Sequence, residues 1–145
     1  MRLIIHKTMA VMIMICVIMS WSSPLFANEV IVIANASVPA DTLDENNIKN
    51  IFLGKSSKWE NNDRITVVIL EYSATHKAFL EKYIKRTPSQ FANVWRQNMF
   101  TGKGKQPYKA ESIEEVVNYV SNTQGAIGYA SSETTLPTSV KVVGN

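Results

Sequence analysis

The chain has 145 residues, of which 46% are hydrophobic and 19% are charged, and its formal net charge is +3. This length is enough for one compact domain with a core of its own. Two of the fifteen basic residues, Arg2 and Lys7, belong to an N-terminal segment of export type, and the other thirteen nearly balance the twelve acidic residues. Without a basic excess the chain has no electrostatic basis for binding nucleic acid, and we exclude nucleic acid as a partner.

The N-terminal segment has the layout of a secretory signal peptide. Its two basic residues precede an apolar run of eleven residues, Met9–Met19, which is too short for a membrane-spanning helix of about 20 residues. Small and polar residues follow, and Leu25-Phe26-Ala27 offers a cleavage site. We therefore predict that residues 1–27 are a cleaved signal peptide, that residues 28–145 form a single domain, and that the protein is periplasmic.

The predicted domain alternates apolar runs of strand length with amphipathic helical segments. The central strand is a mostly β-branched run, as suits a strand covered on both faces. The predicted strands are Val30–Ala34, Arg64–Leu70, Ala126–Ala130 and Val140–Val143.

Four helices are predicted between these strands. Three begin at capping boxes, in which Thr42, Thr87 and Ser112 are each followed three residues later by Glu or Gln. The fourth begins near Ser73 and carries its apolar residues at helical spacing. Thr101–Pro107, rich in glycine and lysine, is expected to be a mobile surface loop. The order of strands and helices predicts an α/β fold, a three-layer α/β sandwich with a mixed sheet.

The turn after the central strand is the strongest candidate for a binding site. Ser73-Ala74-Thr75 opens a helix there, so hydroxyl groups and free backbone N–H groups gather in one place. The helix dipole adds partial positive charge, which favours a small anion. The alternative is that Ser73 or Thr75 only caps the helix.

Other motifs do not support catalysis. Gly54-Lys55-Ser56 resembles the end of a phosphate-binding P-loop, but the first glycine of that motif would fall at Lys49, inside a helix. Ser73 and His76 lie one turn apart without a nucleophile elbow, which argues against a hydrolase. No cysteine follows residue 27, and the spacing around His76 does not indicate zinc. We predict no enzymatic activity, no cofactor and no metal.

Three segments, in this order and at suitable spacing, resemble a known family. They are Ile48–Trp59, Ile65–Phe79 and Gly125–Tyr129. Together they are similar to the second lobe of the phosphate-binding proteins of ABC transporters, which belong to the type II periplasmic binding proteins. The resemblance implies a single lobe of that fold, export to the periplasm, and a ligand that is phosphate or a similar oxyanion.

The resemblance also implies the residues of the site. Ser73-Ala74-Thr75 matches the Ser-Gly-Thr at the helix start that holds phosphate oxygens in the family, and Phe79 matches the aromatic residue that buries that helix. Ser73 and Thr75 would donate hydrogen bonds, the backbone amides of Ala74 and Thr75 would assist, and Lys77 would supply charge. Two departures weaken the expected binding. The family's arginine before the serine is missing, with Glu71 nearby instead, and one lobe leaves the ligand partly in water.

Two functions follow as hypotheses. The first is weak binding of phosphate or a similar oxyanion, linked to phosphate uptake, with a homodimer as one way to rebuild the closed cleft. The second is a periplasmic protein-interaction or sensory module without a small-molecule ligand, whose partner would be a membrane transporter or sensor. An exposed apolar patch near Trp59 or Phe100 would mark the contact surface of such a module.

Overall fold

A computed structural model of the protein describes residues 29–145. The predicted signal peptide, residues 1–27, lies outside the described residues. The strands are β1 (Val30–Asn35), β2 (Thr66–Leu70), β3 (Tyr108–Ala110), β4 (Ala126–Ser131) and β5 (Val140–Gly144). The helices are α2 (Glu45–Phe52), α3 (Ala74–Phe79), the π-helical turn η2 (Leu80–Ile84), α4 (Pro88–Phe100) and α5 (Ile113–Asn122).

The five strands form one mixed sheet in the order β3-β2-β4-β1-β5. β2 runs parallel to both β3 and β4, whereas β1 runs antiparallel to both β4 and β5. The predicted α/β class and the mixed sheet are therefore confirmed.

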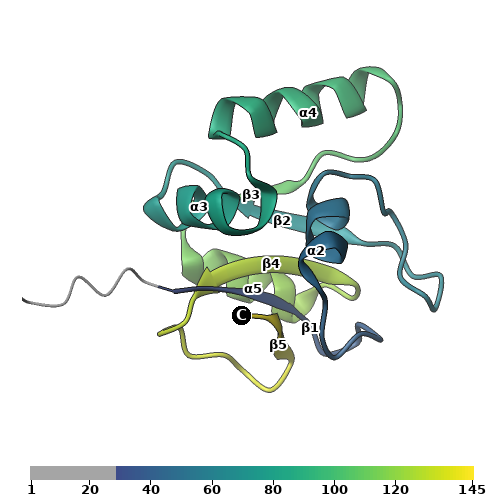
Figure 1. Ribbon diagram of the computed structural model, residues 1–145. Helices are drawn as coiled ribbons and strands as arrows, with labels where there is room; N and C mark the ends of the chain where they lie inside the picture. Colours follow the sequence, from purple (N-terminus) through teal and green to yellow (C-terminus); the bar gives the residue numbers. More distant parts are fainter. Residues whose placement is uncertain (1–28) are drawn as a thin grey trace, which may run out of the picture.

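Helices cover both faces of the sheet, which gives three layers (Figure 1). Neighbouring residues of β4 show this, because successive side chains of a strand point to opposite faces. A Cβ atom on Gly128 would meet Val116 and Val120 of α5. The next residue, Tyr129, stacks instead on Phe79 of α3, with ring centroids 4.0 Å apart. The predicted sandwich is therefore correct.

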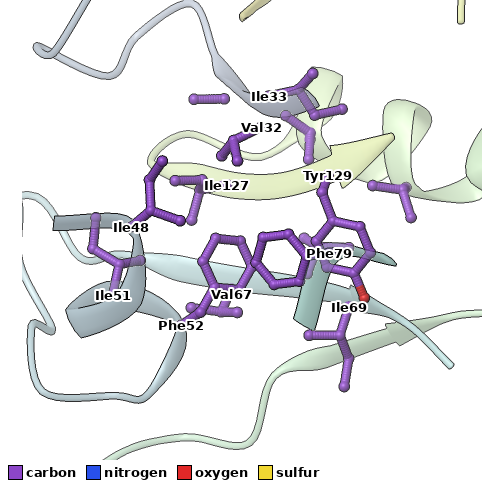
Figure 2. Close-up of a cluster of buried hydrophobic side chains, with 14 of the residues drawn as sticks. Val32, Ile33, Ile48, Ile51, Phe52, Val67, Ile69, Phe79, Ile127 and Tyr129 are labelled. Atoms are coloured by element: carbon purple, nitrogen blue, oxygen red, sulfur yellow. The ribbon is translucent and has the colours of Figure 1, made fainter. Parts of the chain in front are cut away.

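The core on the face of the sheet that α3 covers is aromatic (Figure 2). Phe52 at the end of α2 packs against Phe79, with ring centroids 4.6 Å apart, and against Tyr129 at 5.9 Å. All three side chains are fully buried. Aromatic contacts of this kind stabilise a core beyond the burial of their area. The predicted role of Phe79, to bury the helix that starts at Ser73, is the one that it has here.

Helix α4 lies apart from the sheet in Figure 1, and two hydrogen bonds from its side chains join it to the end of α2. Trp95 Nε1 donates to the Phe52 carbonyl at 2.9 Å, and Asn98 Nδ2 donates to the Leu53 carbonyl at 3.0 Å. These bonds satisfy two of the carbonyls that the end of α2 leaves free. Gly54, with φ at +74°, permits this close approach of α4 to the end of α2. A Cβ atom at this position would lie 2.8 Å from the Asn98 side chain and 3.0 Å from the Trp95 side chain.

One predicted helix start and one predicted capping box need correction. Thr42 is not the N-cap of α2, because the cap is Asp44, whose carboxylate accepts from the Asn47 N–H at 2.7 Å. The Leu43 N–H, just before this cap, bonds to the carbonyl of Val143 on β5 at 2.7 Å. The Ser112 box is only half formed, because Ser112 caps α5 while the Glu115 carboxylate accepts from Tyr108 and from the Glu111 N–H. The Thr87 box forms with both bonds.

Two further differences concern the middle of the chain. The sequence pattern predicts no strand between α4 and α5, but β3 pairs there with β2. The segment predicted as one helix from Ser73 changes at Leu80 into η2, which ends at Lys85 with a left-handed φ of 58°. Its four predicted apolar residues are all buried: Phe79, Leu80, Tyr83 and Ile84.

Candidate functional site: the junction of β2 and α3

The predicted site lies where β2 passes into α3. Tyr72 has a left-handed φ of 52°, which turns the chain sharply after the strand. Ser73 is extended and caps α3, since its Oγ accepts from the His76 N–H at 3.0 Å. The capping role of Ser73 is therefore correct, and its hydroxyl proton remains free to donate a second bond. The amides of Ala74 and Thr75 have no carbonyl one turn earlier to bond to.

A cavity of about 640 Å³ opens in front of this junction, between α3, α4 and the edge of the sheet. Ser73, Ala74 and Lys77 line it, whereas Thr75 does not. Ser73 is partly buried, and Ala74 and Lys77 are exposed. The structure thus brings three of the four predicted site residues to one surface. Thr75 follows on the same helix turn but lies outside the lining.

Four charged side chains line the cavity, and three of them are basic. Lys109 of β3 forms an ion pair with Glu71, with 2.7 Å between Nζ and Oε1. Lys77 of α3 and Arg96 of α4 carry the other two positive charges. The sequence suggests that the Glu71 carboxylate opposes anion binding. In the structure Lys109 neutralises this carboxylate. Sequence reasoning missed Lys109 and Arg96, because no local signal shows that β3 and α4 border the same space.

His76 joins the junction to the core. The Tyr129 hydroxyl accepts from the Leu70 N–H at 2.8 Å and lies 2.5 Å from His76 Nδ1. The hydroxyl also lies 3.4 Å from the Leu70 carbonyl, so it contacts both backbone polar groups of Leu70 as well as the imidazole. Burial lowers the pKa of His76 below its ordinary value, with Glu71 opposing this in part. Burial also raises the pKa of Tyr129. Both groups are therefore neutral near pH 7.

The wall opposite the junction is apolar and comes mainly from α4. Phe91 and Trp95 are almost fully buried, and the Phe91 ring meets the His76 ring edge-on at 5.8 Å. Met99, which is 46% exposed, and Ile69 of β2 complete this wall. The arrangement is a pocket with a polar, positively charged side at α3 and an apolar side at α4.

The residues expected to mark a contact surface differ in exposure. Trp59 is buried, and its Nε1 donates to the Gly125 carbonyl at 3.0 Å, so it is a structural residue. Phe100, at the end of α4, is 89% exposed, and Tyr72 is 98% exposed.

Within residues 29–145, no group of His, Cys, Asp or Glu side chains has the arrangement of a metal site. None of the helices described there has the length and apolar character that crossing a membrane requires.

A family model described as a PBP superfamily domain, PBP_like_2, matches residues 16–144. The chain belongs to this family. No curated protein matches the chain significantly.

Solved structures with the same fold are about twice as long as the matched part of the chain. A structure described as a phosphate ABC transporter substrate-binding protein with bound phosphate, from Clostridium perfringens, matches at 21% identity with a TM-score of 0.63. PstS from Borrelia burgdorferi matches at 16% identity with a TM-score of 0.58. An ABC-type phosphate transport receptor from Vibrio cholerae matches at 17% identity with a TM-score of 0.53. The matches cover 79% of this chain and 43%, 46% and 44% of those chains. The predicted resemblance to one lobe is thus confirmed.

Proposed function

We propose that this protein is exported to the periplasm and binds phosphate or a similar oxyanion weakly at the start of α3. The observation that carries the proposal is the cavity in front of Ser73, whose lining has three basic side chains against one carboxylate. The ligand would accept hydrogen bonds from the Ser73 hydroxyl and from the free amides of Ala74 and Thr75. Lys77 supplies positive charge beside them.

The fold supports this assignment from a second direction. The relatives of known structure include one solved with bound phosphate. Those proteins have more than twice the length that this chain matches, and a ligand bound to one lobe alone has one side in water. Hydrogen bonds there contribute less than in a closed cleft of low dielectric constant. We therefore expect weak binding, which a homodimer with two facing junctions would strengthen.

Calorimetric titration with inorganic phosphate tests the proposal. The key pair of variants is Ser73→Asn and Ser73→Asp, because Asn and Asp cap helices about equally well and differ here in charge. We expect Ser73→Asn to keep phosphate binding and Ser73→Asp to lose it by repulsion. Thr75→Ala should leave phosphate binding nearly unchanged, because Thr75 lies outside the cavity lining. A folded protein that gives no heat at millimolar phosphate would contradict the proposal, as would equal binding by the two Ser73 variants.

The second candidate function is a periplasmic interaction or sensory module without a small ligand. Two exposed aromatic side chains, Tyr72 and Phe100, favour it, since large exposed aromatic residues are enriched at protein interfaces. Its partner would be a membrane transporter or sensor protein. Under this function Ser73→Asp would leave the protein's role in the cell intact, whereas replacing Tyr72 and Phe100 with serine would abolish it.

A further inference from the structure

The cavity in front of α3 is much larger than an inorganic oxyanion requires. Its volume of about 640 Å³ lies within the range of roughly 300 to 1,000 Å³ that is typical of pockets for organic ligands. An anion held at Ser73 and Ala74 would occupy one end. The remaining space, bordered by α4, would be left to water.

The surface around this remaining space is suited to carbon atoms. Phe91, Trp95 and Met99 lie on α4 and face it together with Ile69 and Pro107. The one polar atom of the Trp95 side chain is already bonded to the Phe52 carbonyl. The indole therefore presents only its apolar ring to the cavity. Covering such a surface with an apolar group is favourable in proportion to the area removed from water.

His76 places a polar ring edge on the inner side of the same cavity. The residue is only 7% exposed. Nδ1 contacts the Tyr129 hydroxyl in the core, and His76 lines the cavity. Nε2 lies on the other side of the ring from Nδ1 and has no hydrogen-bond partner within residues 29–145. It is therefore available to a polar atom of a ligand in the cavity.

The charges at the mouth determine the sign of the ligand. Glu71 and Lys109 neutralise each other. Lys77 and Arg96 line the same cavity from α3 and α4, and they leave an excess of two positive charges. An anionic group is therefore attracted to the end of the cavity near α3, while the apolar wall stands opposite.

We propose that the ligand of this cavity is an organic anion, in which a phosphate or carboxylate group is attached to an aromatic ring or a short aliphatic chain. The anionic group binds at Ser73 and Ala74 beside Lys77, and the apolar body lies against Phe91 and Trp95. This inference rests on the proposed function, since it uses the same anion site, and it adds the chemical class of the substrate.

Three probes separate the two parts of the ligand. Inorganic phosphate has the anionic group only, phenol has the ring only, and phenyl phosphate has both. The protein is expressed from its full coding sequence, purified in the form that the cell produces, and titrated with each probe in a calorimeter. We expect phenyl phosphate to bind at least about tenfold more tightly than either of the others, because burial of one ring contributes that much or more.

A matched pair of variants places the ring in the cavity. Ala92→Trp puts a large side chain into the cavity from an exposed position on α4, whereas Gln97→Trp adds the same side chain to the same helix outside the lining. We expect Ala92→Trp to reduce the affinity for phenyl phosphate to that for inorganic phosphate, and Gln97→Trp to change neither.

Each contrary outcome has a distinct meaning. Phenyl phosphate that binds no more tightly than inorganic phosphate, or equal affinities in the two tryptophan variants, would overturn this inference and leave the proposed oxyanion site standing. A folded protein that binds neither phosphate compound would overturn both.

Discussion

The hydroxyl of Tyr129 lies 2.5 Å from Nδ1 of His76 and accepts the N–H of Leu70 at 2.8 Å. One side chain on β4 thus bonds to the last residue of β2 and to the first turn of α3, the helix that follows β2. The contact orients the imidazole so that its other nitrogen is free for the cavity. It therefore links the aromatic core directly to the candidate site.

Replacing Tyr129 with Phe should destabilise the protein. The change leaves the Leu70 N–H and His76 Nδ1 without their partner in a buried place, which costs about 1–3 kcal/mol. Tyr83→Phe is the matched control, because the Tyr83 hydroxyl is buried and has no hydrogen-bond partner within residues 29–145. Its removal should leave the free energy of unfolding unchanged or raise it. Urea denaturation measures both variants, and equal losses would contradict the role of the network.

The stability of the domain should fall with pH below about 6.5 because of His76. Its pKa in the folded protein lies below the ordinary value of 6.5, mainly because of burial. The unfolded chain therefore binds the proton first as the pH decreases. The contribution of neutral His76 is complete above pH 6.5 and is lost as the pH falls from there through the lower folded pKa. His76 is the one histidine after residue 27, so in His76→Asn the free energy of unfolding should vary less between pH 7.5 and 5. If the free energy of unfolding changed with pH equally in the wild-type protein and in His76→Asn, His76 would not be the cause of the pH dependence.

Gly125 should tolerate substitution much less well than Gly102. Both have a positive φ, +75° and +68°, but a Cβ on Gly125 would lie 2.4 Å from the Arg64 carbonyl oxygen, and one on Gly102 would meet nothing within 4 Å. Gly102→Ala should cost about 1–2 kcal/mol for the left-handed backbone alone. Gly125→Ala should cost more, on the order of 4 kcal/mol, because backbone must also move. Thermal unfolding of the two variants tests the difference, and similar melting temperatures would refute it.

The Glu71–Lys109 pair should control phosphate affinity at the proposed site. Glu71→Gln leaves Lys109 unpaired and should tighten phosphate binding about two- to fivefold, as expected for partly exposed charges. Lys109→Met leaves Glu71 unpaired and should weaken binding by a similar factor. Both effects should shrink at high salt through screening. Glu60→Gln, on an exposed loop outside the cavity, is the control, and an effect as large as that of Glu71→Gln would indicate net charge alone.

Features with a local cause could be predicted from the sequence. The apolar runs of β1, β2 and β4 identify buried strands without knowledge of their partners. The Thr87 capping box forms because both of its bonds lie within four residues of one another. Ser73 caps α3 for the same reason. The α/β class and the resemblance to one lobe of the phosphate-binding proteins followed from these local signals and their order.

Features that depend on distant partners could not be predicted in this way. β3 has three residues and no clear periodicity, and it is a strand because β2 supplies its hydrogen bonds. Asp44 rather than Thr42 caps α2, and the Leu43 N–H between them bonds to a carbonyl one hundred residues away. The predicted Thr42 cap was wrong, because both residues are of a type that caps helices and sequence spacing alone did not decide between them.

The sequence by itself thus determined which segments are buried, where most helices begin, and which turn offers free amides to an anion. Only the tertiary structure decided what surrounds that turn. It brought Lys109 of β3 to within 2.7 Å of Glu71 and placed α4 across from Ser73, with a cavity of about 640 Å³ between them. The physical reason is that capping and periodicity act over a few residues, whereas charge pairing and cavity shape depend on contacts between elements far apart in the chain.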